Sequence, residues 1–210
     1  WAVRTKAVGG ALRWPGIRIL IIRRTYRDME NSLITPLVKL IPAEVGRYNG
    51  SSNMVLFQNG SSIKFGHLPN DRATVEGEYQ GQEFDWIFMD EATQFTESEF
   101  RGMGGCLRGV NDIPKRFYLT CNPGGVGHQW VKRLFIDGRF RPGENPDDYI
   151  FIPARFTDNA DLLNSSPGYA AMLDNLPESV RKAHRDGDWN ALSGQYFSEF
   201  SRDVHVIEPF

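Results

Sequence analysis

The stretch FDWIFMDEAT, residues 84–93, decides the fold of this chain. Its apolar centre, residues 86–89, is continuous rather than alternating, which is typical of a parallel strand buried on both faces. Asp90 and Glu91 follow at the carboxyl end of that strand, where open α/β sheets bind their ligands. Such a pair suits nucleotide hydrolysis, because one carboxylate holds Mg²⁺ through water and the next polarises the attacking water. The stretch therefore predicts the acidic motif of an ATPase.

The plainer interpretation is a surface acidic pair that opens a helix, with Thr93 or Thr96 as its cap. A second segment, RFYLTCNP at residues 116–123, shifts the balance, because it is another apolar strand that ends in small hydrogen-bonding side chains. The glycine-rich residues 124–127 follow it. We expect this second strand to lie beside the first.

Five segments follow one another along nearly all of the 210 residues: DEA at 90–92, TCNP at 120–123 within a longer tract to residue 137, IPARFTDN at 152–159, GDW at 187–189 and GQYF at 194–197. Each segment alone is weakly specific. The ordered set resembles the large terminase subunit of tailed bacteriophages, the motor that pumps DNA into an empty capsid.

The resemblance implies an α/β fold of the additional-strand P-loop NTPase type, with a mostly parallel sheet flanked by helices and a small helical lid-like subdomain. We expect an ATPase core over residues 1–150, the lid-like linker over 151–192 and a junction to a nuclease domain over 193–210. Residues 149–156 are predicted as a further apolar strand, and residues 169–185 as a helical tract.

The resemblance also implies ATP and Mg²⁺ as cofactors. Asp90 would organise the metal through its water shell, and Glu91 would act as general base. Thr120 and Asn122 would hydrogen-bond the γ-phosphate or its attacking water and detect its loss. Residues 124–127 would then bend and pass the change to the following helix. The alternative is an ordinary strand-to-helix turn, in which the glycines serve tight geometry alone.

Arg72 is a candidate for an arginine that one subunit supplies to the nucleotide site of its neighbour. It lies in the polar connector 66–83 just before the acidic strand. A solvated loop arginine is the plainer interpretation. Two further arginines, Arg23 and Arg24, follow the buried apolar run 17–22, and the sequence does not say which of them has which role.

The sequence contains no phosphate loop ending in Gly-Lys-Ser or Gly-Lys-Thr. The chain starts at Trp1, and residues 1–8 have the spacing of a helix that would follow such a loop, with Gly9-Gly10 interrupting it. We therefore expect truncation before residue 1, loss of the phosphate-loop strand, and no ATP hydrolysis by this piece alone. The implied nuclease would begin near Phe210, and a metal site at Asp203, His205 and Glu208 is disfavoured on so short a tail.

Charge is unevenly distributed along the chain. Residues 75–100 hold eight acidic side chains and no Lys or Arg, whereas residues 101–141 hold eight basic side chains and two acidic ones. A basic run is more often a solvated face, so it favours a DNA partner only modestly. Nothing resembles a membrane span or signal peptide, and the two cysteines, Cys106 and Cys121, favour neither a disulfide framework nor a zinc site.

The resemblance implies these partners: double-stranded DNA, the portal protein, the small terminase subunit and further copies of the chain in a ring, with no membrane, in the host cytoplasm. Residues 29–40 are predicted as a helix broken by Pro36, and Asn59-Gly60 predicts a hairpin between residues 54–57 and 61–65. Two alternatives to the packaging motor stay open: a helicase-like ATPase stimulated by nucleic acid, and a non-catalytic module that binds DNA or the capsid.

Overall fold

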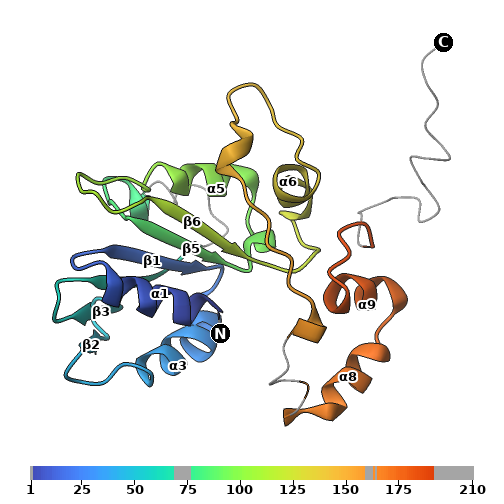
Figure 1. The fold of residues 1–210 in the computed structure, drawn as a ribbon, viewed down its shortest axis with the longest axis horizontal. Coiled ribbons are helices and arrows are strands. Elements are labelled where there is room, and N and C mark those ends of the chain that lie inside the picture. Colours follow the sequence, from blue (N-terminus) through green and yellow to red (C-terminus); the bar gives the residue numbers. More distant parts are fainter. Residues whose placement is uncertain (1, 69–76, 159–162, 164, 192–210) are drawn as a thin grey trace. The chain divides into compact units, whose positions relative to one another are not determined.

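The structure is a computed structural model that describes residues 2–68, 77–158, 163 and 165–191. The chain divides into two compact units, Trp1–Cys121 and Asn122–Phe210, and each is described by itself (Figure 1). The predicted boundaries at residues 150 and 192 stay predictions. Within the described residues, no helix is both long enough and apolar enough to cross a membrane.

The described part of the first unit contains a six-stranded sheet in the order β2-β3-β4-β1-β5-β6. Its strands are β1 (Arg18–Arg23), β2 (Gly46–Asn49), β3 (Met54–Phe57), β4 (Ser62–His67), β5 (Trp86–Asp90) and β6 (Arg116–Thr120). β1 pairs in parallel with β4 and β5, and β5 pairs in parallel with β6. β2, β3 and β4 are antiparallel neighbours, with the predicted hairpin between β3 and β4. The predicted α/β fold with a mostly parallel sheet is confirmed.

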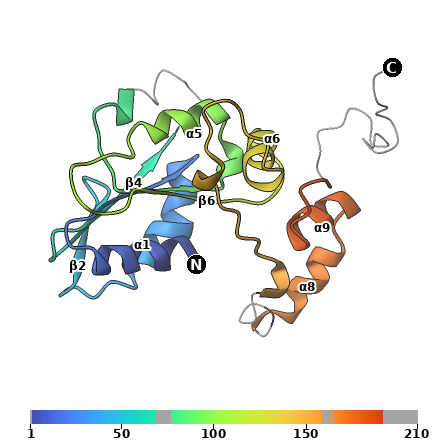
Figure 2. The same cartoon turned by 45° about the horizontal axis from the view of Figure 1, so that its top comes forward.

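Helices cover both faces of this sheet. They are α1 (Ala2–Arg13), α2 (Tyr26–Met29), the π-helical η1 (Glu30–Ile34), α3 (Thr35–Val38), the short 3₁₀ helix η2 (Ala92–Gln94) and α5 (Glu97–Gly104). α1 and α5 lie on opposite sides of the sheet (Figure 2). Because successive strand residues face opposite ways, the continuous apolar strands β1 and β5 bury both of their faces.

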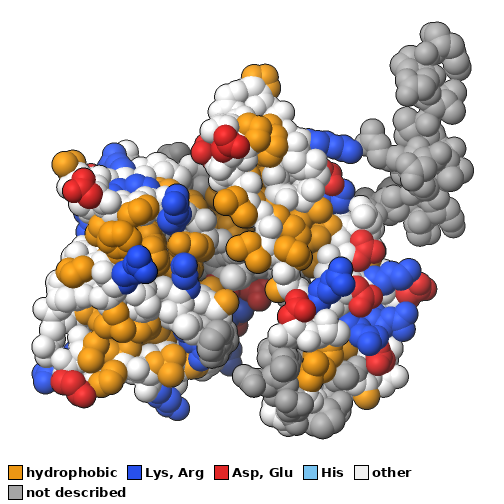
Figure 3. Space-filling model, in the orientation of Figure 1, with side chains coloured by type: hydrophobic (Ala, Val, Ile, Leu, Met, Phe, Trp, Pro, Cys, Tyr) orange, Lys and Arg blue, Asp and Glu red, His pale blue; other side chains and the backbone are white. Residues whose placement is uncertain are grey.

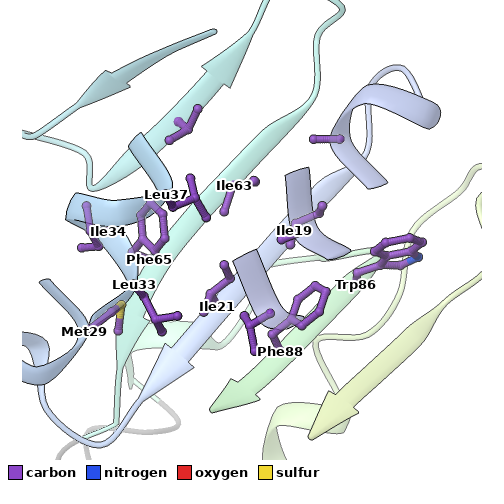
Figure 4. Close-up of a cluster of buried hydrophobic side chains, with 14 of the residues drawn as sticks. Ile19, Ile21, Met29, Leu33, Ile34, Leu37, Ile63, Phe65, Trp86 and Phe88 are labelled. Atoms are coloured by element: carbon purple, nitrogen blue, oxygen red, sulfur yellow. The ribbon is translucent and has the colours of Figure 1, made fainter. Parts of the chain in front are cut away.

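The largest apolar cluster lies on the face covered by α1 and the segment α2-η1-α3 (Figure 4). Alternate strand residues enter it, such as Ile19 and Ile21 of β1 and Phe88 of β5. The helical segment contributes Leu33 and Leu37 among others. Burying such side chains stabilises the fold by roughly 1.5–3 kcal/mol each. This cluster fixes β1 and β5 side by side, and so fixes the strand ends where the acidic pair lies.

Two sequence expectations about helices are wrong. Gly9-Gly10 does not interrupt α1, because the helix needs a residue without a side chain at its contact with Trp86: a Cβ on Gly10 would lie 2.2 Å from the indole ring. Pro36 does not break the second helix either. The chain stays helical from residue 26 to 38 and passes through the π-helical η1 just before Pro36. A wider turn there accommodates the proline ring and its lost N–H.

The second unit consists of short helices and loops in its described residues. The helices are α6 (His128–Val131), the π-helical η3 (Lys132–Ile136), the 3₁₀ helices η4 (Pro146–Asp148) and η5 (Phe156–Asp158), α8 (Pro167–Asp174) and α9 (Glu178–Arg185). The last two match the predicted helical tract. The strand predicted over residues 149–156 is wrong: the segment forms no ladder among the described residues, and Ile150 and Ile152 are exposed. An apolar run becomes a strand only when a neighbour accepts and donates its backbone hydrogen bonds.

β6 is the outer strand of the described sheet and is less buried than β5 beside it. Its Tyr118 stacks on Phe88 of β5 with ring centroids 4.7 Å apart, and the ammonium of Lys6 lies 5.6 Å from the Tyr118 centroid. Figure 3 shows hydrophobic side chains at the surface in the region of α1 and β6, with Lys and Arg among them. The outer edge of this sheet is thus apolar and aromatic next to basic groups.

Asp85, just before β5, is fully buried and holds the amino-terminal ends of the strands together. Its carboxylate accepts hydrogen bonds from the Arg18 backbone N–H at 2.8 Å and the Asn111 amide at 2.9 Å. The Lys115 ammonium lies 2.9 Å from it. Burial alone raises the pKa of Asp85, but these hydrogen bonds and the positive charge outweigh it and leave the pKa below its usual value.

We expect Asp85→Ala to lower the free energy of unfolding by about 2 to 4 kcal/mol, because buried donors lose their acceptor. The partly exposed Glu83, which pairs with Arg18, is the matched control, and Glu83→Ala should cost less than about 1 kcal/mol. Denaturant unfolding measures both. Since the folded-state pKa of Asp85 is lowered, its contribution is present at neutral pH and is lost as the pH falls through that pKa. Equal losses for the two variants would contradict this account.

Candidate functional site: an acidic corner at the end of β5

Asp90 and Glu91 lie at the carboxyl end of β5, as predicted. Asp90 is the last residue of the strand, and its side chain is 15% exposed. The Glu91 side chain is 33% exposed, so one carboxylate is largely enclosed and the next is partly exposed to water. We call Asp90, Glu91 and the groups that contact them the acidic corner.

The backbone of Glu91 is in the left-handed region, at φ 57° and ψ 51°. This conformation costs a residue with a side chain roughly 1–3 kcal/mol and persists only when the surroundings impose it. The strand ends at Asp90 and the 3₁₀ helix η2 starts at Ala92, so Glu91 makes the turn between them in a single residue. The turn directs two adjacent carboxylates to the same end of the sheet, a form of strain that clusters at functional sites.

Thr120 lies directly beside Asp90, because the parallel register of β5 and β6 pairs these two residues. The Thr120 hydroxyl donates a hydrogen bond to Asp90 Oδ1 over 2.5 Å. The predicted neighbouring strand is confirmed, and its last residue, Thr120, contacts Asp90 of the acidic pair. This bond fixes Oδ1, and the other oxygen, Oδ2, lies 3.4 Å from Arg23 Nε.

Arg23 is the residue of this corner whose role the sequence left open. It ends β1, which pairs with β5, and its Nε lies 3.4 Å from Asp90 Oδ2 while its Nη2 lies 3.6 Å from Glu91 Oε1. Its guanidinium also donates to the Asp28 carbonyl at 3.2 Å and to the Ser32 hydroxyl. One fork of donors therefore partly neutralises two adjacent carboxylates. The sequence feature that points to Arg23 is its position at the end of an apolar run, which becomes the strand parallel to β5.

Arg24 turns away from the acidic corner. Its guanidinium forms a bidentate ion pair with Glu99 of α5, at 2.7 and 2.9 Å, and stacks over Phe95 at 4.2 Å from the ring centroid. It also donates to the carbonyls of Gln94 and Leu68. Burial raises the pKa of Glu99, but the hydrogen bonds from Arg24 and Thr96 outweigh burial and lower it. Arg24 thereby ties the end of β1 to the segment that follows the acidic pair.

Thr96 caps α5, as the plainer interpretation of the acidic stretch expected. Its hydroxyl accepts from the Glu99 backbone N–H at 3.3 Å, while Glu99 accepts from the Thr96 backbone N–H at 2.7 Å. The helix cap of the plainer interpretation is therefore present, but Thr96 and Glu99 form it and the acidic pair does not take part. The helix opens at Thr96, and Asp90 and Glu91 lie before it at the strand end.

The two remaining predicted site residues, Asn122 and Arg72, stay predictions. Asn122 opens the second compact unit, so its place beside a phosphate stays a prediction. Arg72 lies outside the described residues. Cys121, the residue after β6, is partly buried. Burial, together with the negative charges of Glu91 and Asp90, raises the pKa of its thiol to about 12, so it stays protonated.

The donor set fits a hard divalent cation. Asp90 and Glu91 offer carboxylate oxygens that are not hydrogen-bonded to Thr120, and the Arg23 guanidinium beside them occupies the place of positive charge that a cation would take over. The described residues contain no group of three or more His, Cys, Asp or Glu that would hold an ion by themselves. An ion bound here would take most of its ligands from water and phosphate oxygens, as Mg²⁺ does with nucleotides.

A mostly parallel sheet with an acidic pair at the end of an inner strand, beside a strand that ends in a hydroxyl, defines an α/β protein of the P-loop NTPase type. The sequence pattern of the family described as phage terminase large subunit matches residues 2–170. The chain therefore belongs to the phage terminase large subunit family.

Solved structures show the same fold. The large terminase of a thermophilic bacteriophage, in complex with ADP, aligns with a TM-score of 0.66 and 16% identity, over 89% of this chain and 44% of that one. The large terminase ATPase domain of Thermus phage P74-26 aligns with a TM-score of 0.53 and 15% identity, over 90% of this chain and 82% of that one. The chain thus spans less than half the length of the first of these proteins. No curated protein matches it.

The two adjacent arginines generate a stability prediction. Arg24→Gln leaves the largely buried Glu99 without its bidentate partner, so we expect a loss of about 2 to 4 kcal/mol in the free energy of unfolding. Arg23→Gln, the matched control, loses carboxylate contacts that are longer than those of Arg24, together with hydrogen bonds to Asp28 and Ser32, and should cost less, about 1 to 2 kcal/mol. Denaturant unfolding of the two variants gives the order. The reverse order would show that the assignment of the arginines is wrong.

Proposed function

We propose that this chain is the ATPase part of a DNA-packaging motor, which couples hydrolysis of Mg²⁺-ATP to the movement of double-stranded DNA into a capsid. The observation that carries the proposal is the acidic corner, where Asp90 is fixed by Thr120 and Glu91 is held in a strained turn beside Arg23. Family membership supplies the class of motor. The large terminase of the thermophilic bacteriophage has been solved with ADP and with ATP-γ-S, which supports a nucleotide as the ligand of the corner.

The two carboxylates have different environments and therefore different roles. Asp90 is enclosed and hydrogen-bonded, which suits a group that orients a metal through its water shell. Glu91 is partly exposed to water, which suits a general base that takes a proton from the attacking water. When bound with ATP, Mg²⁺ supplies positive charge to the phosphate oxygens. Arg23 holds both carboxylates in place until that charge is present.

Thr120 and Asn122 have the sensing role in this proposal. The Thr120 hydroxyl already contacts Asp90, so a change at the phosphate alters a bond at the tip of β6. The chain then continues through Asn122 into the glycine turn that starts the second unit. Arg72, donated to a neighbouring copy in a ring, remains the proposed trans arginine.

The wider proposals come from the family. The partners are double-stranded DNA, the portal protein and the small terminase subunit, in the host cytoplasm, and a nuclease accompanies the ATPase in the full-length protein. Residues 1–210 contain no Gly-Lys-Ser or Gly-Lys-Thr loop, so we expect them to be inactive alone. The full-length protein is therefore the material for every activity test.

We expect Glu91→Gln in the full-length protein to lower kcat for ATP hydrolysis by roughly 10²–10⁴-fold, because the amide cannot accept the proton of water. Binding of ATP-γ-S should change little, since the substitution keeps the shape of the side chain. Glu97→Gln, in a partly exposed pair with Arg101 on α5, is the matched control and should leave both measurements unchanged. Normal turnover by the Glu91 variant would rule out its assignment as the base.

Thr120 is tested by a pair of substitutions. Thr120→Val keeps the volume and removes the hydroxyl that positions Asp90, so we expect kcat to fall by roughly tenfold or more, as for a lost positioning hydrogen bond. Thr120→Ser restores the hydroxyl and should recover most of the rate. Steady-state ATPase kinetics of the full-length variants decide the matter. If both variants lose activity equally, shape rather than the hydrogen bond matters at this position.

A further inference from the structure

The turn that follows Pro123 is fastened by a buried histidine. Gly124 and Gly125 have φ values of 116° and 75°, which residues with side chains rarely adopt. The Gly124 backbone N–H donates to His128 Nδ1 over 2.9 Å, and the His128 backbone N–H donates to the Gly125 carbonyl over 3.2 Å. His128, the first residue of α6, therefore fixes the turn through both its side chain and its backbone.

The other face of His128 contacts Trp189. The two rings lie 5.3 Å apart between centroids at an angle of 32°, and the residues are only 4% and 6% exposed. Trp189 follows a turn that is itself attached to α9, because the Asp188 backbone N–H donates to the Lys182 carbonyl over 3.0 Å. The imidazole thus bridges two segments that are far apart in the sequence, the glycine turn and the end of α9.

The neutral ring is the form that this arrangement requires. Nδ1 accepts a hydrogen bond, so the proton of the neutral imidazole is on Nε2. Burial lowers the pKa of His128 and Lys132 lowers it further, while the Trp189 backbone opposes the shift without cancelling it. The bond to Gly124 is therefore present at neutral pH.

A histidine that only fills space would not need both contacts. Val131, on the same helix, offers only a buried apolar side chain for packing. His128 instead uses its acceptor for the first glycine after the Asn122-Pro123 pair and its ring face for Trp189. Its position suits a link between the glycine turn, which follows the proposed sensor strand along the chain, and the segment just after α9.

We propose that His128 is a positioning residue that latches the glycine turn to Trp189, so that movement of the turn during the ATP cycle reaches the end of α9. The inference rests on the proposed motor function and adds to it the residue that would transmit movement from the glycine turn to the end of α9. A contact path by itself does not measure energetic coupling, so the decisive quantity is the coupling between the two ends of the latch.

Two substitutions separate the two contacts of the latch. His128→Asn keeps a side-chain acceptor for the Gly124 N–H and removes the ring, whereas His128→Phe keeps a ring against Trp189 and removes the acceptor. Gln129→Ala, at the exposed next position of α6, is the matched control. Trp189→Leu removes the far end of the latch. All variants are made in the full-length protein.

The first measurement is the number of base pairs packaged into purified empty capsids for each ATP hydrolysed. We expect His128→Asn, His128→Phe and Trp189→Leu to lower this ratio by roughly two- to thirtyfold, the range of a modest coupling energy. ATP hydrolysis without capsids should stay within about threefold of wild type. The double variant His128→Asn/Trp189→Leu should be no worse than the worse single one, because both changes break the same contact.

The second measurement is hydrogen exchange at the Gly124 amide. Trp189→Leu should speed this exchange if Trp189 holds His128 in place, and Gln129→Ala should not. An unchanged packaging ratio, or a fall in ATPase that matches the fall in packaging, would overturn the latch. If wild-type protein hydrolyses no ATP, the proposed function fails instead, and exchange at Gly124 then decides the latch alone: an unchanged rate in Trp189→Leu refutes it.

Discussion

The parallel pairing of β5 with β6 is the constraint on which the rest of the site depends. Its register places Thr120 opposite Asp90, and the hydroxyl then meets the carboxylate at 2.5 Å. A shift of one residue would turn every side chain to the other face of the sheet and separate these two groups. The register is held by aromatic contacts along both strands, such as the stack of Phe88 on Tyr118, and at the opposite end by Asp85, which pairs with Lys115 just before β6. The packing of the core therefore determines the geometry of the acidic corner.

Two adjacent arginines acquire different roles because β1 ends between them. Arg23 ends β1 and faces the acidic pair, whereas Arg24 faces α5 and holds Glu99. Both are partly buried and both contact a carboxylate, so exposure and charge do not tell them apart. What separates them is their place in the chain: Arg23 is the last residue of β1, whereas Arg24 lies in the bend that follows the strand. One chain segment thereby contacts both the acidic corner and α5, the helix that follows the acidic pair.

The predictions succeeded where local pattern and tertiary environment agree. Two continuous apolar runs became parallel strands, and the polar residues at their ends met. The predictions failed where a distant partner decides the outcome: α1 runs through Gly9-Gly10 because Trp86 packs against the helix there, and residues 149–156 form no strand because no described neighbour pairs with them. Asn122 and Arg72 stay predictions, since the first starts the separate second unit and the second lies outside the described residues.

The sequence by itself determined the class of fold, the acidic pair and the family, because these depend on residue type and order along single strands. Only the tertiary structure assigned Arg23 to the acidic corner, revealed the left-handed backbone of Glu91 and brought His128 against Trp189. The physical reason is that each of these features joins or strains parts of the chain through contacts that no local pattern encodes. A residue's neighbours in space depend on the register and packing of the whole unit, and its type alone does not specify them.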